Sequence, residues 1–208
     1  GGVMAKNAPW RGSVATWQSR IDHWIARSNP NDLLSVDIFF DQRAVCGDGS
    51  LAVAVRQAAF AAAEGQAAFA KLLVEGISVP RSVGFFGGIR TEHGRIDLKR
   101  SGLFSVVSAA RAMAIRYGVM ERSTPARLAG VKARLHVSAG DLDAVGGAHG
   151  VFLDLILSQQ IEDISHGTSP SNAVVVKRLS ARDQERLRSA LEAVACVDQL
   201  VRDVLFKG

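Results

Sequence analysis

The stretch from Leu103 to Gly118, LFSVVSAARAMAIRYG, sets the fold class of this 208-residue chain. Its apolar side chains recur at the spacing of one helix face, at Leu103, Val106, Val107, Ala110, Met113, Ala114 and Tyr117. Gly118 follows at the position where helices commonly end in a left-handed residue. The stretch therefore predicts a helix with a buried face, and Arg111 lies at the border of that face, where its stem can pack while its head reaches a cleft.

Helical patterns continue on both sides of this stretch. We expect helices from Ser13 to about Arg27, from Ser50 to about Glu75 with a weak point at Gly65, from Thr124 to about Leu135, from Leu142 to near Gly167, and from Ser180 to Phe206. Ser13, Thr124 and Ser180 are the predicted N-caps. Residues 1–11 read as the end of a strand followed by a loop. Periodicity leaves open whether Val36–Phe40 is a strand or a short buried helix.

The segment from Pro80 to Gly102 is the predicted non-helical insert. Gly84–Arg90 and Gly94–Lys99 flank the turn-like Glu92-His93-Gly94, which is typical of a β-hairpin. Long helices joined by loops favour antiparallel packing. The sequence therefore predicts a mainly α fold, an antiparallel helical bundle with one small β-hairpin insert.

Composition narrows the cellular setting. The chain is 48% hydrophobic and 22% charged, which is typical of a globular protein. No uncharged stretch approaches the ~20 residues that span a bilayer, and the N-terminus lacks the pattern of a signal peptide. The only cysteines, Cys46 and Cys196, fit a reducing compartment. We therefore expect a cytoplasmic protein without a membrane segment.

Charge and motifs limit the function classes. The chain has 25 Lys and Arg against 20 Asp and Glu, but the arginines are scattered and aromatic residues make up only 6%. This pattern argues against a nucleic-acid surface and favours a phosphate-bearing small molecule or an acidic partner. The sequence contains no phosphate loop, dinucleotide fingerprint, zinc spacing or nucleophile elbow. It assigns no catalytic residue and no metal ligand, so the chain alone does not look like a complete enzyme.

Polar residues next to apolar runs are the candidate site residues. Asp37, Asp41 and Arg43 surround Ile38-Phe39-Phe40. The two carboxylates could hold a metal or orient a substrate, or they could form an internal Asp–Arg pair that fixes the segment, and the sequence leaves both readings open.

A second candidate group follows the predicted hairpin. Asp97 and Lys99 alternate with apolar residues and so share one face, and Arg100 comes next. Arg127 lies in the first turn of the helix predicted to begin at Thr124. These residues join Arg111 as candidates for lining a cleft.

Four blocks of sequence in this order resemble a known family. They are DIFFDQRAVCGD (37–48), GRIDLK (94–99), ARAMA (110–114) and TPARL (124–128). They are similar to the C-terminal region of the nucleotidyltransferases that often carry CBS domains, relatives of the PII-protein uridylyltransferase, where the region is called the nucleotidyltransferase substrate-binding domain. Residues 1–10 also resemble the last stretch of that family's catalytic domain.

The resemblance implies a helical domain that closes over a polymerase-β-like catalytic domain and positions a nucleotide or a protein acceptor. Residues 1–30 would be the end of the catalytic domain plus a connecting helix, and residues 31–208 the substrate-binding domain. The chain begins Gly1-Gly2-Val3-Met4, and we expect it to be an inactive piece of a longer protein.

The resemblance also implies cofactors and partners. In the full-length protein, carboxylates of the catalytic domain would hold Mg²⁺ and a nucleoside triphosphate would be the donor. The implied partners are the protein's own catalytic and CBS-type sensor domains and a PII-like acceptor in signal transduction. The residues that match family motif positions, and so become candidate substrate-binding residues, are Asp41, Arg43, Asp97, Lys99 and Arg111; Arg127 completes the set from the helix start.

The alternative is a helical dimerisation or protein-interaction module with no ligand of its own. The last predicted helix has an apolar face wider than a core contact needs, made of Ala190, Leu191, Val194, Val197, Leu200, Val201, Val204 and Leu205. A homodimer through this face remains open.

Overall fold

The computed structural model describes residues 6–77, 79, 81–84, 87–135 and 140–206 and confirms the mainly helical fold class. The helices of this described part are α1 (Val14–Arg27), α2 (Leu33–Phe40), α3 (Gly49–Ala63), α4 (Ala67–Glu75), α5 (Phe104–Arg116), α6 (Thr124–Lys132), α7 (Gly140–Ser165), α8 (Ala181–Ala195) and α9 (Val197–Phe206). Strands β1 (Arg95–Asp97) and β2 (Ala173–Val175) form a small antiparallel sheet. Among the described helices, none is both long and apolar enough to cross a membrane.

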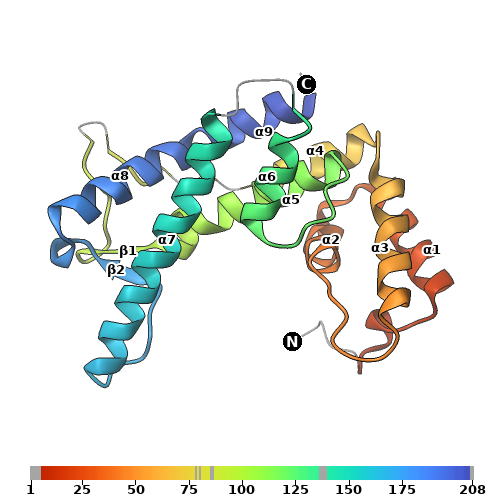
Figure 1. Ribbon diagram of the computed structural model, residues 1–208, viewed down its shortest axis with the longest axis horizontal. Helices are drawn as coiled ribbons and strands as arrows, with labels where there is room; N and C mark the ends of the chain where they lie inside the picture. The colour runs from red at the N-terminus through yellow and green to blue at the C-terminus, as the bar shows by residue number, and fades with distance from the viewer. Residues whose placement is uncertain (1–5, 78, 80, 85–86, 136–139, 207–208) are drawn as a thin grey trace.

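Helix α5 is the centre of the molecule and contacts α2, α3, α4, α6, α7 and α9 (Figure 1). Ten of its 13 residues are buried, so it is enclosed on most of its circumference and not only on the predicted face. Alanine and serine occupy many of the remaining positions, and such small side chains let neighbouring helices approach closely. Gly118 ends the helix with a φ of +63°, as predicted.

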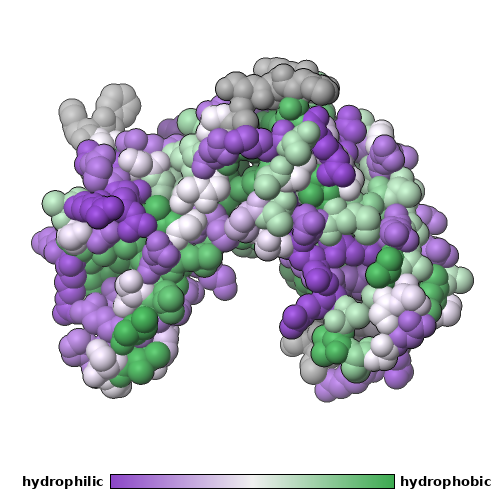
Figure 2. Space-filling view, in the orientation of Figure 1, coloured by the Kyte–Doolittle hydropathy of each residue, from purple (hydrophilic) through white to green (hydrophobic). Residues whose placement is uncertain are grey.

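Two groups of elements extend from the region around α5 as the legs of an arch, while α4, α6, α8 and α9 lie with α5 across its top (Figure 1). One leg consists of α1, α2 and α3. The other is the C-terminal half of α7 with the chain that returns to β2. The space-filling view shows a hollow between the two legs (Figure 2).

An aromatic cluster holds the first leg together and decides the state of residues 36–40. Trp17 and Trp24 of α1 contact the ring of Phe39, while Phe40 contacts Phe60 of α3. Phe39 and Phe40 are both buried, because α1 and α3 cover different sides of a helix there. The segment is the helix α2, and helical spacing places Asp37 and Asp41 on one face.

The predicted hairpin is wrong in its strand pairing. Strand β1 pairs with β2, with Ile96 opposite Val174, and not with Gly84–Arg90. The turn itself exists, because Glu92 and Arg95 exchange backbone hydrogen bonds across His93 and Gly94, which have φ values of +51° and +78°. Val83 and Ile89 form only an isolated bridge, and Phe85 and Phe86 lie outside the described residues.

Local helix boundaries differ from the predictions in three places. The helix expected over 50–75 divides into α3 and α4 at Gly65, the predicted weak point, whose φ is +72°. The last helix divides into α8 and α9 at Cys196. Ser123, not Thr124, caps α6, because its hydroxyl accepts from the Ala126 amide. At the N-terminus, the predicted strand falls partly on residues 1–5, outside the described residues, and Ala8–Trp10 form a 3-10 turn.

Candidate functional site

The first group of candidate residues forms an ion-pair network between α2, α5 and α6. Arg111 Nη2 lies 2.5 Å from Asp41 Oδ2, and Arg127 Nη2 lies 2.6 Å from Asp41 Oδ1. Arg127 also donates to the backbone carbonyls of Phe40 and Glu121 and is only 2% exposed. One carboxylate therefore joins three helices.

Asp37 adds a second carboxylate to this network. Its Oδ1 lies 3.0 Å from Arg111 Nη1. Burial raises the pKa of Asp37, and the pairing with Arg111 does not fully offset it. Burial acts in the same direction on Asp41, but the hydrogen bonds and charges of Arg111 and Arg127 outweigh it and lower the pKa of that carboxyl. The two carboxylates thus stand in different electrostatic environments.

A third buried arginine, Arg56 of α3, extends the network and was missed by sequence reasoning. Its Nη2 donates to the carbonyls of Met120 and Glu121, and its guanidinium lies over the Phe60 ring. Burial, and then the nearby charges of Arg127 and Arg122, lower the pKa of Arg56. An alanine-rich helix gives no sign that its single arginine is buried.

This geometry matches the internal-pair reading of Asp37 and Asp41. Both carboxylates are occupied by guanidinium groups. In the part of the chain that the structure describes, no group of three or more His, Cys, Asp or Glu side chains could hold a metal ion. Asp41, Arg111 and Arg127 thus brace the junction of the first leg with α5.

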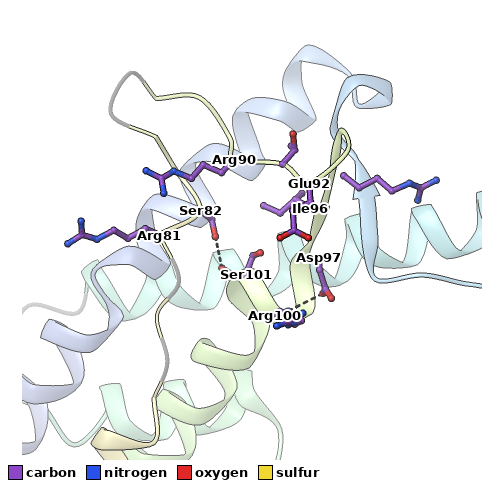
Figure 3. Close-up of a pocket in the computed structure, with 10 residues that line it drawn as sticks. Arg81, Ser82, Arg90, Glu92, Ile96, Asp97, Arg100 and Ser101 are labelled. Atoms are coloured by element: carbon purple, nitrogen blue, oxygen red, sulfur yellow. Dashed lines mark hydrogen bonds between the residues drawn. The ribbon is translucent and has the colours of Figure 1, made fainter.

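The second group lies at the other end of α5, in a polar groove. Arg81, Arg90, Arg95 and Arg100 line a pocket of about 430 Å³ together with Ser82, Thr91, Glu92, Ile96, Asp97 and Ser101 (Figure 3). The Ser82 hydroxyl donates to the Ser101 carbonyl at 3.4 Å and ties the loop to the start of α5. The lining contains four arginines and two carboxylates, so it has a formal charge of +2.

A neighbouring hollow of about 410 Å³ shares Asp97 and Arg100 with this pocket and adds Lys99 and Phe104. We call the two hollows together the α5 groove. Asp97 Oδ1 accepts from the Arg100 amide at 3.1 Å and fixes the turn. Residues Lys99–Leu103 form a π-helical turn, a feature often found at functional sites.

The six predicted site residues thus fall in three places. Asp41, Arg111 and Arg127 meet in the ion-pair network, and Asp97 and Lys99 meet in the α5 groove. Arg43 is exposed after α2, and no ion pair holds it among the described residues. Twelve residues, roughly 18 Å at 1.5 Å per residue, separate Lys99 from Arg111 along the helix axis.

Sequence reasoning missed part of the α5 groove as well. Arg81 and Arg90 line this groove before Arg100 in the same insert, and their side chains point the same way (Figure 3). The sequence does contain a signal that Arg81 and Arg90 lie close together, because Gly87 and Gly88 mark a turn between them. The predicted pairing of Gly84–Arg90 with Gly94–Lys99 was wrong and hid this signal. Phe104 continues an apolar run in the sequence, so its spacing alone does not distinguish it from a core residue.

Comparison with known families gives two matches. The family model described as "Putative nucleotidyltransferase substrate binding domain" matches residues 66–204, about two thirds of the chain. The model described as "Putative nucleotidyltransferase DUF294" matches residues 1–31. No curated protein and no solved structure gives a significant match.

Proposed function

The chain belongs to the nucleotidyltransferase substrate-binding-domain family, and from this premise we propose that its α5 groove holds the substrate of a nucleotidyl-transfer reaction. The observation that supports this proposal is the set of unpaired cationic side chains at the groove. Lys99, Arg100 and Arg90 are exposed, and no ion pair occupies them among the described residues. Phosphate oxygens are the natural partners of such groups.

The roles of the charged candidate residues follow from which of them already form ion pairs inside the protein. Arg111 and Arg127 are used inside the protein, so their role is to fix α2 and α6 against α5. Lys99 and Arg43 are free to contact a ligand. Catalysis in this arrangement is positioning, because a fixed substrate reacts without the entropy loss of a bimolecular encounter.

Nucleotidyl transfer uses a nucleoside triphosphate and Mg²⁺, and in a protein of this family the Mg²⁺ would be held by the catalytic partner of this domain. The described residues of this chain do not fit a metal site, because Asp37 and Asp41 already pair with arginines and no other acidic group is clustered. We therefore assign the metal to the catalytic domain.

The finer identity of the reaction rests on the sequence resemblance. We propose a cytoplasmic signalling enzyme similar to the PII-protein uridylyltransferase, with a PII-like protein as acceptor and CBS-type sensor domains in the same chain. The four motif blocks support this proposal. The hollow of the arch offers a place for the catalytic domain to dock (Figure 2).

A thermal-shift series tests the groove. The chain is melted with ATP, UTP, CTP or GTP, each with and without Mg²⁺. A ligand at a hundred times its dissociation constant adds about 2.7 kcal/mol, which raises the melting temperature by roughly 5–10 °C for a chain of this size. Lys99→Ala should abolish the rise, while Lys71→Ala, on the exposed face of α4, should keep it. A rise that survives Lys99→Ala contradicts the assignment.

Self-association is the second candidate function. In the structure, the helix with an exposed apolar face is α7 and not the last predicted helix. The apolar face of the last predicted helix is mostly buried in the core of the protein, since Leu191, Val194 and Val201 are 0–3% exposed. Helix α7 instead exposes Leu153, Leu157, Ile161 and Ile164, each by 45–63%. Figure 2 shows this apolar stripe along the second leg of the arch.

We propose a second copy of the chain as the occupant of the α7 stripe. The four side chains of the stripe are uncharged, and Asp154, which follows Leu153, already pairs with Arg186. A two-fold axis would place the stripe on itself, so no free charge is desolvated. From Leu153 to Ile164 the face is roughly 17 Å long and 10 Å wide, or about 170 Å² per copy, which predicts a weak, concentration-dependent dimer.

Sedimentation equilibrium from micromolar to 200 µM tests this second candidate. The wild-type chain should shift from monomer to dimer, and Leu157→Lys should remain a monomer. Leu51→Lys is the matched control, because Leu51 is 54% exposed on α3. A wild-type chain that stays monomeric throughout rules the interface out.

A further inference from the structure

We infer that the α5 groove binds a nucleoside triphosphate in two parts, with the base on the Phe104 ring and the phosphates on Lys99 and Arg100. This inference rests on the proposed function and names the substrate class. Phe104 is 51% exposed and lines the same hollow as Lys99, Arg100 and Asp97. An aromatic face beside free cations is the arrangement that a nucleotide requires.

Phe104 stands out among the phenylalanines. Phe39, Phe40, Phe60, Phe69 and Phe152 are at most 6% exposed, and Phe206 is the other described phenylalanine with an exposed ring, at 49%. Exposing such a ring costs the free energy that its burial would give. Phe206 lies in the last described turn of α9, whereas Phe104 opens the central helix next to a polar groove.

The π-helical turn explains how Lys99 and Phe104 share one hollow. In an α-helix, residues five apart point about 140° away from each other at 100° per residue. Here the Phe104 amide donates to the Lys99 carbonyl, which is the five-residue bond of a π-turn. The wider turn brings Phe104 round to the side of Lys99. The backbone irregularity therefore has a chemical consequence, since it pairs an aromatic face with an ammonium group.

The rest of the groove fits the remaining parts of a nucleotide. Asp97 lines both hollows, and its Oδ1 accepts from the Arg100 amide, which leaves Oδ2 to accept from a ribose hydroxyl. Arg81 and Arg90 line the adjoining pocket and point the same way (Figure 3). These two residues add positive charge beside the phosphate site, and their side chains extend away from Asp97 and Arg100 (Figure 3).

Comparing ATP with inorganic tripolyphosphate tests the inference, because only ATP carries a base. Affinities are measured by titration calorimetry of the whole chain. Wild type should bind ATP at least 10-fold more tightly than tripolyphosphate, as a stacked base predicts. Phe104→Ala should remove that preference and leave tripolyphosphate binding unchanged. Phe104→Trp should restore it and add fluorescence quenching by ATP. Phe206→Ala, the matched control, should behave as wild type.

The outcomes separate the inference from the proposed function. Lys99→Ala should weaken both ligands, because both carry phosphates. If wild type binds ATP and tripolyphosphate equally, or if Phe104→Ala keeps the preference for ATP, the base is not on Phe104 and the inference is wrong, while the groove remains an anion site. If wild type binds neither ligand at millimolar concentration, the proposed function of the groove fails and the inference fails with it.

Discussion

Arg127 Nη2 lies 2.6 Å from Asp41 Oδ1, a contact that joins the first turn of α6 to the residue that caps the C-terminus of α2. The same carboxylate accepts from Arg111 through its other oxygen. Since Arg127 is 2% exposed, its charge has almost no access to water and depends on Asp41 and two carbonyls for compensation. Asp41 is therefore the residue on which the junction of the first leg depends.

Asp41→Asn should destabilise the protein more than Asp37→Asn. The Asp41 change removes the negative charge that accepts three hydrogen bonds from Arg111 and Arg127, and it leaves Arg127 buried without its counter-charge. We expect a loss of about 2 kcal/mol, less than for a fully buried pair because the Asp41 side chain is 40% exposed. Asp37→Asn should cost under about 1 kcal/mol, since burial disfavours the Asp37 charge. Urea unfolding at pH 7 measures both, and equal losses would contradict this ranking.

Acidification should change the contributions of Asp41 and Asp37 to stability in opposite directions. The pKa of Asp41 is lowered below its ordinary 3.8, so its stabilisation is present above pH 3.8 and is lost as the pH falls through the folded-state pKa. The pKa of Asp37 is raised, so its contribution is present below pH 3.8 and is lost as the pH rises through the folded-state pKa. The unfolding free energy of Asp41→Asn should therefore fall less than that of wild type below pH 4. A parallel fall in the two proteins would show that Asp41 is not the group that titrates.

Gly102→Ala should destabilise the start of α5. A Cβ at this position would lie 2.4 Å from Cε2 and Cζ of Phe152, a ring that is fully buried and cannot move freely. We expect a loss of about 1–3 kcal/mol from overpacking, with partial recovery when Phe152→Leu is added.

Gly147→Ala in α7 is the control for Gly102→Ala. Its Cβ would meet no atom within 4 Å, so the helix preference of alanine should raise the unfolding free energy by about 0.5–1 kcal/mol. Thermal unfolding shows whether each substitution stabilises or destabilises the protein. A stabilising Gly102→Ala would mean that the Phe152 ring can shift to make room for the new Cβ, which would contradict the prediction.

Gln159→Leu should loosen the sheet that carries Asp97. The Gln159 side chain accepts from the Val175 amide in β2 and donates to Asp163, and both side chains are buried. Leaving the Val175 amide without an acceptor should cost about 1–3 kcal/mol. Hydrogen exchange should accelerate at Val175 and its partner strand Arg95–Asp97. Gln199→Leu, at an exposed position on α9, should change neither stability nor exchange by a measurable amount.

The sequence by itself determined the elements whose signals are local. The apolar spacing from Leu103 to Tyr117, the cap at Ser13 and the break at Gly65 are each produced by neighbouring residues, and each is found in the structure. The family was also readable from the sequence, because three of the four motif blocks (94–99, 110–114 and 124–128) fall within the residues that the family model matches.

Only the tertiary structure decided the pairings between distant residues. The sequence predicted that Arg95–Asp97 pairs in a hairpin, because the nearest strand-like segment directly precedes it. Its partner is instead Ala173–Val175, which follows α7 in the chain. The sequence also could not distinguish charges that brace the fold, such as Arg111 and Arg127, from charges that no ion pair holds among the described residues, such as Lys99. The physical reason is that a guanidinium's role depends on whether a carboxylate lies within hydrogen-bond distance, and for Arg127 that carboxylate is 86 residues away.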